Sequence, residues 1–352
     1  MTDRPKRSRT APDLHRPGRD CREIARRPRA TADTVTAVNP VSTPPPWQQT
    51  VLRPPPWPPL LVAARWWVRY GPGIAVKQRL LREWLDVGLQ QRPRPPKTVR
   101  TRYGQRFLVP TTSDFIARAI YIHGCWEACI SRLVASRLQR GDGFIDIGSA
   151  CGWYAVLAAR LVGRTGYVIA IEPAAHEQLL ANLALNNIGN VRVVQAAITT
   201  EPGTVTLYTP HANTGATTTI RPDTYQSTVT VPGLLLAQML HPGDLENARI
   251  IKVDVEGAEG TVLTQLATSI PRLREDCEII VEVTPHWLDI AGHDVETILK
   301  PFMDNGFHAC RIQNSYAPED IPVMLRHPLP SALATGPLPR QIDLLLTRAA
   351  ES

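Results

Sequence analysis

The sequence has no apolar run long enough to cross a membrane. A spanning helix needs about 20 consecutive apolar residues, and the best candidate, from Leu60 to Val68, is short and contains Arg65. The basic N-terminal stretch, including Arg26-Arg27, is not followed by an apolar segment, so it does not resemble a signal peptide. We therefore expect no transmembrane segment and no export signal.

Cysteine pairs with the spacing of metal ligands are missing as well. The six cysteines include no Cys-x-x-Cys, and Cys125 and Cys129, in a stretch that looks helical, have no further ligands nearby. Buried thiols in a reducing compartment account for this usage better than disulfides or a cysteine-bound metal. The cysteine pattern thus predicts a cytoplasmic protein.

Acidic residues are scarce in the first 100 residues, which hold 20 Lys and Arg against 7 Asp and Glu. Residues 101–352 hold 19 against 25, so the net charge of +7 describes neither part. Prolines follow the same division, with 17 of the 33 in the first 100 residues. Because the part that can fold is acidic, we do not expect a nucleic-acid substrate.

Three regions follow from these shifts in composition. Residues 1–59 are rich in Pro and Arg without apolar periodicity, which predicts a disordered arm; its two Pro-Pro-Pro-Trp motifs suit either a linker or a docking site. Residues 60–96 form a basic amphipathic helical segment and a linker. This segment could pack on its own domain, lie on an anionic membrane surface, cover a groove or mediate self-association. Residues 97–352 form the third region.

The third region alternates short β-rich runs with helical stretches. The predicted strands are 144–147, 167–171, 191–197, 250–255, 279–283, 309–312 and 342–346. The predicted helices are 113–139 with a break near 123–124, then 152–162, 175–187, 258–268 and 294–305. Such alternation predicts an α/β fold with a mostly parallel sheet covered on both faces. An insertion after the third strand holds a predicted strand, 204–208, and a helix, 234–240.

The first chemical motif joins a strand to a glycine-bearing turn, from Asp146 to Gly152. The next predicted strand ends at Glu172, where a carboxylate can bind both hydroxyls of a ribose. The turn lacks the Gly-x-Gly-x-x-Gly spacing of dinucleotide sites. An Asp two residues before Gly148 suits the cationic ligand S-adenosylmethionine (SAM) better than a pyrophosphate.

The second motif places three ionisable residues, Lys252, Asp254 and Glu256, on one face of a predicted central strand. Burying them unpaired costs several kcal/mol. We therefore expect Asp254 and Glu256 at the carboxyl end of the strand, where open α/β sheets bind ligands. Glu282 is likewise an ionisable residue within an apolar stretch, the next predicted strand. A structural network of ion pairs is the alternative explanation.

The order of these motifs resembles the FkbM family of SAM-dependent methyltransferases over residues from about 97 to 348. The resemblance is carried by the motif that ends at Gly152, Glu172-Pro173, Asn182 to Asn186 and Lys252 to Glu259. Ser149 and Ala150 depart from the family, which usually has Ala and Asn there. The resemblance implies a Rossmann-like class I methyltransferase fold with a seven-stranded, mostly parallel sheet.

The resemblance further implies transfer of a methyl group from SAM, most often to a hydroxyl of a sugar, glycolipid or secondary metabolite. The residues implied to bind SAM are Asp146, Gly148, Ser149, Gly152 and Glu172. Asp254, Glu256 and Glu282 would line the acceptor side, with Asp254 or Glu256 as the general base and Lys252 orienting them. His211 is an alternative base.

Three questions stay open at this point. A divalent metal on Asp254 and Glu282 is conceivable from their oxygen chemistry, although we expect no metal site. The oligomeric state and any peripheral membrane contact are undetermined. The alternative function is a non-catalytic or differently specific Rossmann-like protein whose basic arm binds a partner or a membrane surface.

Overall fold

A computed structural model describes residues 58–211, 213–326, 332–333 and 341–348 of the chain. The predicted disordered arm, residues 1–59, lies outside these residues except for its last two positions. The boundaries of the three predicted regions therefore stay predictions. No helix of the described part is long and apolar enough to cross a membrane.

The main sheet contains all seven predicted strands and one short additional strand. The strand order is β12-β11-β13-β10-β9-β3-β4-β5, and β9, β10, β3, β4 and β5 pair in parallel. β13 runs antiparallel to both of its neighbours. The strands are β3 (Gly143–Ile147), β4 (Tyr167–Ile171), β5 (Val191–Val194), β9 (Ala248–Val253), β10 (Glu278–Val283), β11 (His308–Ile312), β12 (Ala332–Leu333) and β13 (Ile342–Thr347).

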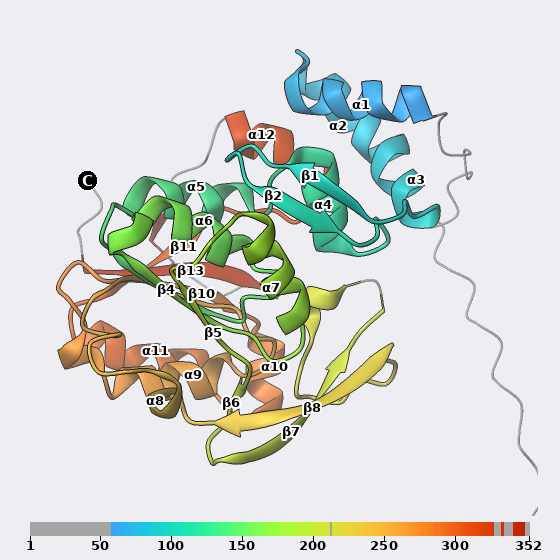
Figure 1. The fold of residues 1–352 in the computed structure, drawn as a ribbon. Coiled ribbons are helices and arrows are strands. Elements are labelled where there is room, and N and C mark those ends of the chain that lie inside the picture. Colours follow the sequence, from blue (N-terminus) through green and yellow to red (C-terminus); the bar gives the residue numbers. More distant parts are fainter. Residues whose placement is uncertain (1–57, 212, 327–331, 334–340, 349–352) are drawn as a thin grey trace, which may run out of the picture. The chain divides into compact units, whose positions relative to one another are not determined.

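Helices cover both faces of this sheet (Figure 1), and the central strands are buried on both sides. On one face lie α4 (Phe115–His123), α5 (Ala128–Arg137), α6 (Trp153–Val162), α7 (His176–Leu185) and α12 (Ile321–Arg326). On the other face lie α8 (Leu236–Met239), α9 (Glu259–Ala267), α10 (Pro285–Ile290) and α11 (Val295–Asp304). Two apolar cores thus sandwich the sheet, as the sequence pattern predicted.

The segment before the sheet packs on the first of these cores. Leu61 and Val68, together with Leu81, Leu85 and Leu89, are buried in the same cluster as α4 and α5. The elements are α1 (Pro58–Tyr70), α2 (Ile74–Leu80), a π-helical turn η2 (Leu81–Leu85), α3 (Asp86–Gln91) and a hairpin of β1 (Lys97–Arg100) and β2 (Arg106–Val109). Of the four arrangements open for this segment, the structure shows packing on its own domain.

The insertion forms a second, three-stranded sheet that lies beside the carboxyl ends of β4 and β5. It consists of β6 (Ala197–Ile198), β7 (Gly203–Thr209) and β8 (Ser227–Leu234). The predicted strand 191–197 is wrong in its extent, because the chain leaves the main sheet after Val194 to pair with β8. The predicted helix 234–240 is also too long, because β8 continues to Leu234. Short 3₁₀ turns are η3 (Gly163–Thr165), η4 (Thr214–Ala216) and η5 (Ile270–Arg272).

Candidate active site

A cavity opens at the carboxyl ends of β3, β4, β9 and β10. The chain runs from β3 outward to β5 on one side and from β9 outward to β10 on the other, so the cavity lies at the point where the strand order reverses. It has two lobes of about 60 and 210 Å³, and both are lined by Gly148, Ala150, Gly215, Asp254 and Glu256. The predicted position of Asp254 and Glu256 after the end of β9 is confirmed.

The glycine loop after β3 closes tightly on the loop after β9. Gly148 has φ of +85°, and a Cβ atom at this position would lie 1.8 Å from the backbone oxygen of Asp254. Asp254 in turn donates its backbone N–H to Ile147 O at 2.9 Å. Gly152 has φ of +83°, and a Cβ there would lie 2.4 Å from Leu179 Cδ1. Gly148 is therefore required by a close backbone contact, and both positions favour glycine because of their positive φ.

Glu172 holds the glycine loop through its carboxylate. Oε2 accepts a hydrogen bond from Ala150 N, and Oε1 accepts from the backbone N of Ala174 and of Ala175, each at 2.7 Å. Burial raises the pKa of Glu172, while these three N–H groups oppose the rise. Glu172 lines the smaller lobe beside apolar side chains, including Ile171 and Ile198. This lobe can hold a flat apolar ring next to a hydroxyl-binding carboxylate.

Asp146 lies beneath the loop and is not among the residues that line either lobe. Its side chain is fully buried, and neither carboxylate oxygen has a hydrogen-bond partner among the described residues. Burial raises the pKa of Asp146 to about 7, although Lys252, its register partner on β9, opposes the rise. Ser149 donates its hydroxyl to the backbone oxygen of Asp146 at 2.9 Å. A direct contact of Asp146 with SAM stays a prediction.

Lys252 is the one lysine that lines the larger lobe. Its Nζ lies 2.5 Å from Asp254 Oδ2 and 4.7 Å from the centre of the Tyr154 ring. Burial alone would lower the pKa of Lys252, but Asp254, Glu127 and Asp146 outweigh it and raise the pKa above its ordinary value. The predicted pairing of Lys252 with a neighbouring carboxylate is thus present, and the lysine is charged.

Glu282 meets a second glutamate across a tyrosine hydroxyl. Tyr316 Oη lies 2.7 Å from Glu282 Oε2 and 2.8 Å from Glu127 Oε1. A tyrosine hydroxyl carries a single proton, so it can donate to only one of the two carboxylates. The other contact is a hydrogen bond only when that carboxyl group is itself protonated. The geometry therefore favours one proton on the two carboxyl groups in addition to the hydroxyl proton of Tyr316. We call this group the Glu127–Tyr316–Glu282 triad.

The acidic groups around the larger lobe hold their protons more tightly than usual. Burial and then neighbouring carboxylates raise the pKa of Glu282 well above its ordinary value and that of Asp343 to about 8. Burial also raises the pKa of Glu127, and burial together with Asp254 raises that of Glu256 to about 7. The larger lobe thus holds more carboxyl groups than cations, and these carboxyl groups retain part of their protons at neutral pH.

One carboxylate oxygen from each of Glu127, Asp254 and Glu282 lies within 4.8 Å of the others. Such a set suits a hard divalent cation. However, Lys252 already brings a positive charge to Asp254 at 2.5 Å. That the protein needs no metal stays a prediction.

Several residues of the cavity were not predicted from the sequence. Glu127, at the start of α5, accepts the hydroxyl of Tyr154 at 2.7 Å through Oε2. Gln341 donates to Glu282 Oε1 at 2.5 Å, and Asp343 lies opposite Glu282 in the β10–β13 register. Asp343 interrupts an apolar strand just as Glu282 does, and this signal could have identified it. His211, the alternative base, is exposed and does not line the cavity.

Comparison with known proteins finds a family for part of the chain that lines this cavity. Residues 142–309 match the sequence model of the methyltransferase FkbM domain. This segment belongs to the FkbM family. The FkbM domain includes the glycine loop, Glu172 and the motif from Lys252 to Glu259. FkbM methyltransferases use SAM as the methyl donor.

Individual relatives are distant. A protein-L-isoaspartate O-methyltransferase 2 of Archaeoglobus fulgidus is 37% identical over 59 residues, which is 16% of this chain and 27% of that protein. A precorrin-6y C5,15-methyltransferase of Geobacter metallireducens is 12% identical with a TM-score of 0.33, covering 62% of this chain and 86% of that chain. A Streptococcus mutans protein solved with SAH is 10% identical with a TM-score of 0.35, covering 62% and 94%.

Proposed function

We propose that the protein is a SAM-dependent O-methyltransferase that acts on a hydroxyl group of a sugar, glycolipid or secondary metabolite. The observation that supports this most directly is the two-lobed cavity, with an apolar lobe beside Glu172 and an acidic lobe around Asp254. Two ligands in adjoining lobes are what a transfer reaction requires, because the reacting groups must be held in line with one another.

The charge of the cavity suits SAM. Among the described residues, its walls carry one cation, Lys252, and five carboxyl groups, which favours a ligand with a sulfonium and an ammonium group over one with phosphates. The carboxyl groups are those of Glu127, Glu172, Asp254, Glu256 and Glu282. The smaller lobe would hold the adenine and ribose, with Glu172 at the ribose hydroxyls. When bound, SAM supplies the electrophilic methyl group.

The larger lobe supplies acceptor binding and proton removal. Asp254 is a quarter exposed and lines both lobes, so its carboxylate can reach an acceptor hydroxyl placed beside the methyl donor. We assign the general base to Asp254, with Glu256 as the alternative. Lys252 fixes the orientation of Asp254 through their 2.5 Å ion pair. Carboxylates together with the aromatic walls of Trp126 and Tyr316 suit a ligand rich in hydroxyl groups.

Two experiments in sequence test this function. Isothermal titration of the folded protein with SAM comes first, and we expect saturable one-to-one binding. A screen of sugars, glycolipids and hydroxylated secondary metabolites with isotope-labelled SAM then identifies the acceptor by incorporated label and by the position of the new methyl ether. Absence of SAM binding would refute a methyltransferase. Methylation on nitrogen or carbon only would retain SAM binding but refute the hydroxyl acceptor.

A further inference from the structure

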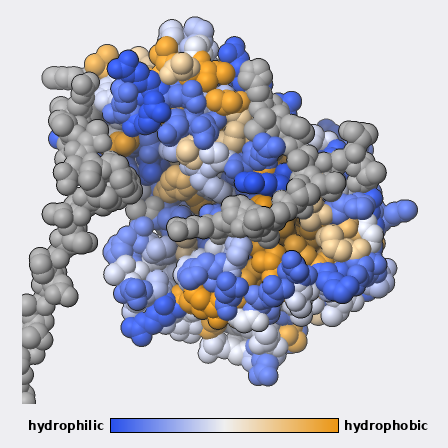
Figure 2. Space-filling view, turned by 180° about the vertical axis from the view of Figure 1, so that it is seen from behind, coloured by the Kyte–Doolittle hydropathy of each residue, from blue (hydrophilic) through white to orange (hydrophobic). Residues whose placement is uncertain are grey.

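The outward face of helix α1 is apolar and aromatic. Of the nine large apolar side chains that are exposed in the described residues, six lie between Leu60 and Val76. Val62, Trp66 and Tyr70 are 61%, 57% and 63% exposed, and they follow one another at helical spacing on one side of α1. Figure 2 shows hydrophobic and strongly hydrophilic residues next to each other at the end of the domain that carries α1 and α2.

The two charged residues of α1 point the other way. Arg65 donates to the backbone oxygen of Tyr121 at 2.6 Å, and Arg69 donates to the oxygens of Tyr121 and Ile122 at 2.9 Å. These carbonyls belong to the last turn of α4, where backbone oxygens lack helical partners and attract cations. A surface helix normally exposes its charges and buries its apolar side. In α1 both arginine side chains point toward α4, and the exposed face carries no charged residue.

A group of cations lies near the carboxyl end of α1. Arg102 donates to the backbone oxygen of Arg69 at 2.8 Å, at the end of α1. Burial, followed by the charges of Arg102 and of Arg326, lowers the pKa of Lys77 on α2. None of the ion pairs among the described residues includes Lys77, Arg102 or Arg326. We call these three residues the cationic cluster; α1, α2 and α12, which carry or adjoin it, lie together in Figure 1.

We propose that the exposed face of α1 and the cationic cluster bind the surface of an anionic lipid bilayer. Trp and Tyr side chains are favoured at the level of lipid headgroups, and aliphatic residues such as Val62 can enter the adjoining acyl region. Cations that form no ion pair with a carboxylate are attracted to acidic lipids. A second copy of the chain fits the face less well, because a symmetric contact would bring two cationic clusters close together.

Vesicle sedimentation of the full-length chain tests this proposal. We use vesicles of phosphatidylcholine alone and vesicles in which about a third of the lipid is phosphatidylglycerol. The wild type should bind the anionic vesicles and bind the neutral ones much more weakly. Replacing Val62 and Trp66 together by Ser should weaken binding by about tenfold or more. Ile290→Ser is the matched control, because Ile290 is 53% exposed on α10, on the opposite face of the sheet, and should bind as the wild type does.

The charge component has its own variant, Lys77→Gln with Arg326→Gln, which should reduce binding to anionic vesicles only. Circular dichroism and thermal unfolding confirm that each variant is folded. Equal binding by the wild type and the Val62/Trp66 variant would overturn the proposal and transfer the role to another part of the chain. So would equal affinity for neutral and anionic vesicles. Dimerisation in analytical ultracentrifugation that the Val62/Trp66 variant loses, without vesicle binding, would identify a second copy as the partner instead.

Discussion

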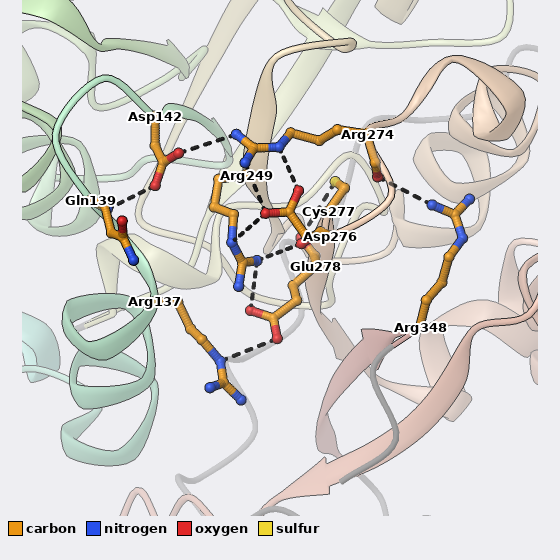
Figure 3. Close-up of polar contacts among 9 residues, drawn as sticks. All are labelled: Arg137, Gln139, Asp142, Arg249, Arg274, Asp276, Cys277, Glu278 and Arg348. Carbon is orange, nitrogen blue, oxygen red and sulfur yellow. Dashed lines mark hydrogen bonds and ion pairs between the residues drawn. The ribbon is translucent and has the colours of Figure 1, made fainter.

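The two ends of strand β10 each carry a buried glutamate in opposite electrostatic surroundings. Glu278, at the amino end, is 4% exposed, and Glu282, at the carboxyl end, is 7% exposed. Figure 3 shows the first environment: Glu278 Oε1 lies 3.2 Å from Arg137 Nε, and Oε2 lies 2.9 Å from Arg249 Nη1. At this end of the strand each oxygen of the carboxylate has an arginine.

Further pairs of arginine and carboxylate side chains lie next to Glu278. Arg274 bonds Asp276 through Nε and Nη2 at 2.5 and 2.8 Å and reaches Asp142 at 3.1 Å (Figure 3). At the other end of β10, the hydrogen-bond partners of Glu282 within the described part of the chain are the hydroxyl of Tyr316 and the amide of Gln341. The amino end of β10 is therefore built for stability. At the carboxyl end no arginine balances the carboxyl group of Glu282 among the described residues. Such a group suits the binding of a cationic or hydroxylated ligand.

Asp254→Asn breaks the acidic end most directly. Because asparagine cannot take up the acceptor's proton, we expect kcat to fall by roughly 10²–10⁴-fold. The dissociation constant for SAM should change by only a few-fold, since asparagine keeps the shape of the side chain and Glu172 is unchanged. Steady-state kinetics with the identified acceptor and titration with SAM measure the two quantities. Asp289→Asn, at an exposed position on α10, is the control. A larger loss in SAM affinity than in kcat would contradict the assigned role.

Matched substitutions on the same strand compare the two ends in terms of stability. Glu278→Gln removes the charge opposite Arg249, whose side chain is 14% exposed, and should lower the free energy of unfolding by about 3 kcal/mol. Glu282→Gln replaces a carboxyl group whose pKa is raised by burial and neighbouring carboxylates, and it keeps an acceptor for Tyr316, so its cost should be under about 1 kcal/mol. Denaturant unfolding at neutral pH measures both. Equal losses would show that the two glutamates are equally structural.

The pH dependence of stability separates the two ends again. Burial and neighbouring carboxylates raise the pKa of Asp343 from 3.8 to about 8, so the folded protein binds a proton that the unfolded chain releases. Stability from this group is greatest below about pH 4 and is lost as the pH rises to about 8. Asp343→Asn should therefore reduce the downward slope by up to about 1.4 kcal/mol per pH unit.

Asp276 provides the control for this measurement at the arginine-rich end. Burial opposes the shift, but Arg274 holds the pKa of Asp276 below its ordinary value. Its contribution to stability is present above the ordinary pKa and is lost only in more acidic solution. Asp276→Asn should thus leave the slope between about pH 5 and 8 unchanged. A flat wild-type profile in this range would contradict the raised pKa values of the acidic cluster.

The fold was largely predictable because apolar periodicity reports burial directly. All seven predicted strands are present, and the structure places Asp254 and Glu256 where the charge pattern of their strand predicted. The chain's departure from the main sheet after Val194 was not predictable, because Val191 to Ala197 reads as one strand. Its pairing partner, β8, lies more than thirty residues further along the chain.

The site was predictable only where a charge interrupts an apolar strand. Lys252 and Glu282 gave this signal and were predicted. Asp343 gives the same signal but was not predicted. Glu127 and Tyr316 are 189 residues apart and lie outside the strands, so no local pattern indicates that they meet. Their meeting depends on how the start of α5 and the segment after β11 pack over the sheet, which is a tertiary property.

The smallest expected effect concerns Glu172, a third buried glutamate, which is surrounded by backbone N–H groups rather than by arginines or acids. One of these donors is Ala150, whose φ of +44° is unfavourable for any residue with a Cβ atom. Ala150→Gly should relieve this strain and raise the free energy of unfolding by about 0.5–1 kcal/mol. Thermal unfolding measures it, and Ala184→Gly in α7 should have the opposite sign because glycine weakens a helix. Should Ala150→Gly destabilise the protein instead, the hydrogen bond to Glu172 would depend on the conformational restriction that alanine provides, and the loop would be held rigid rather than strained.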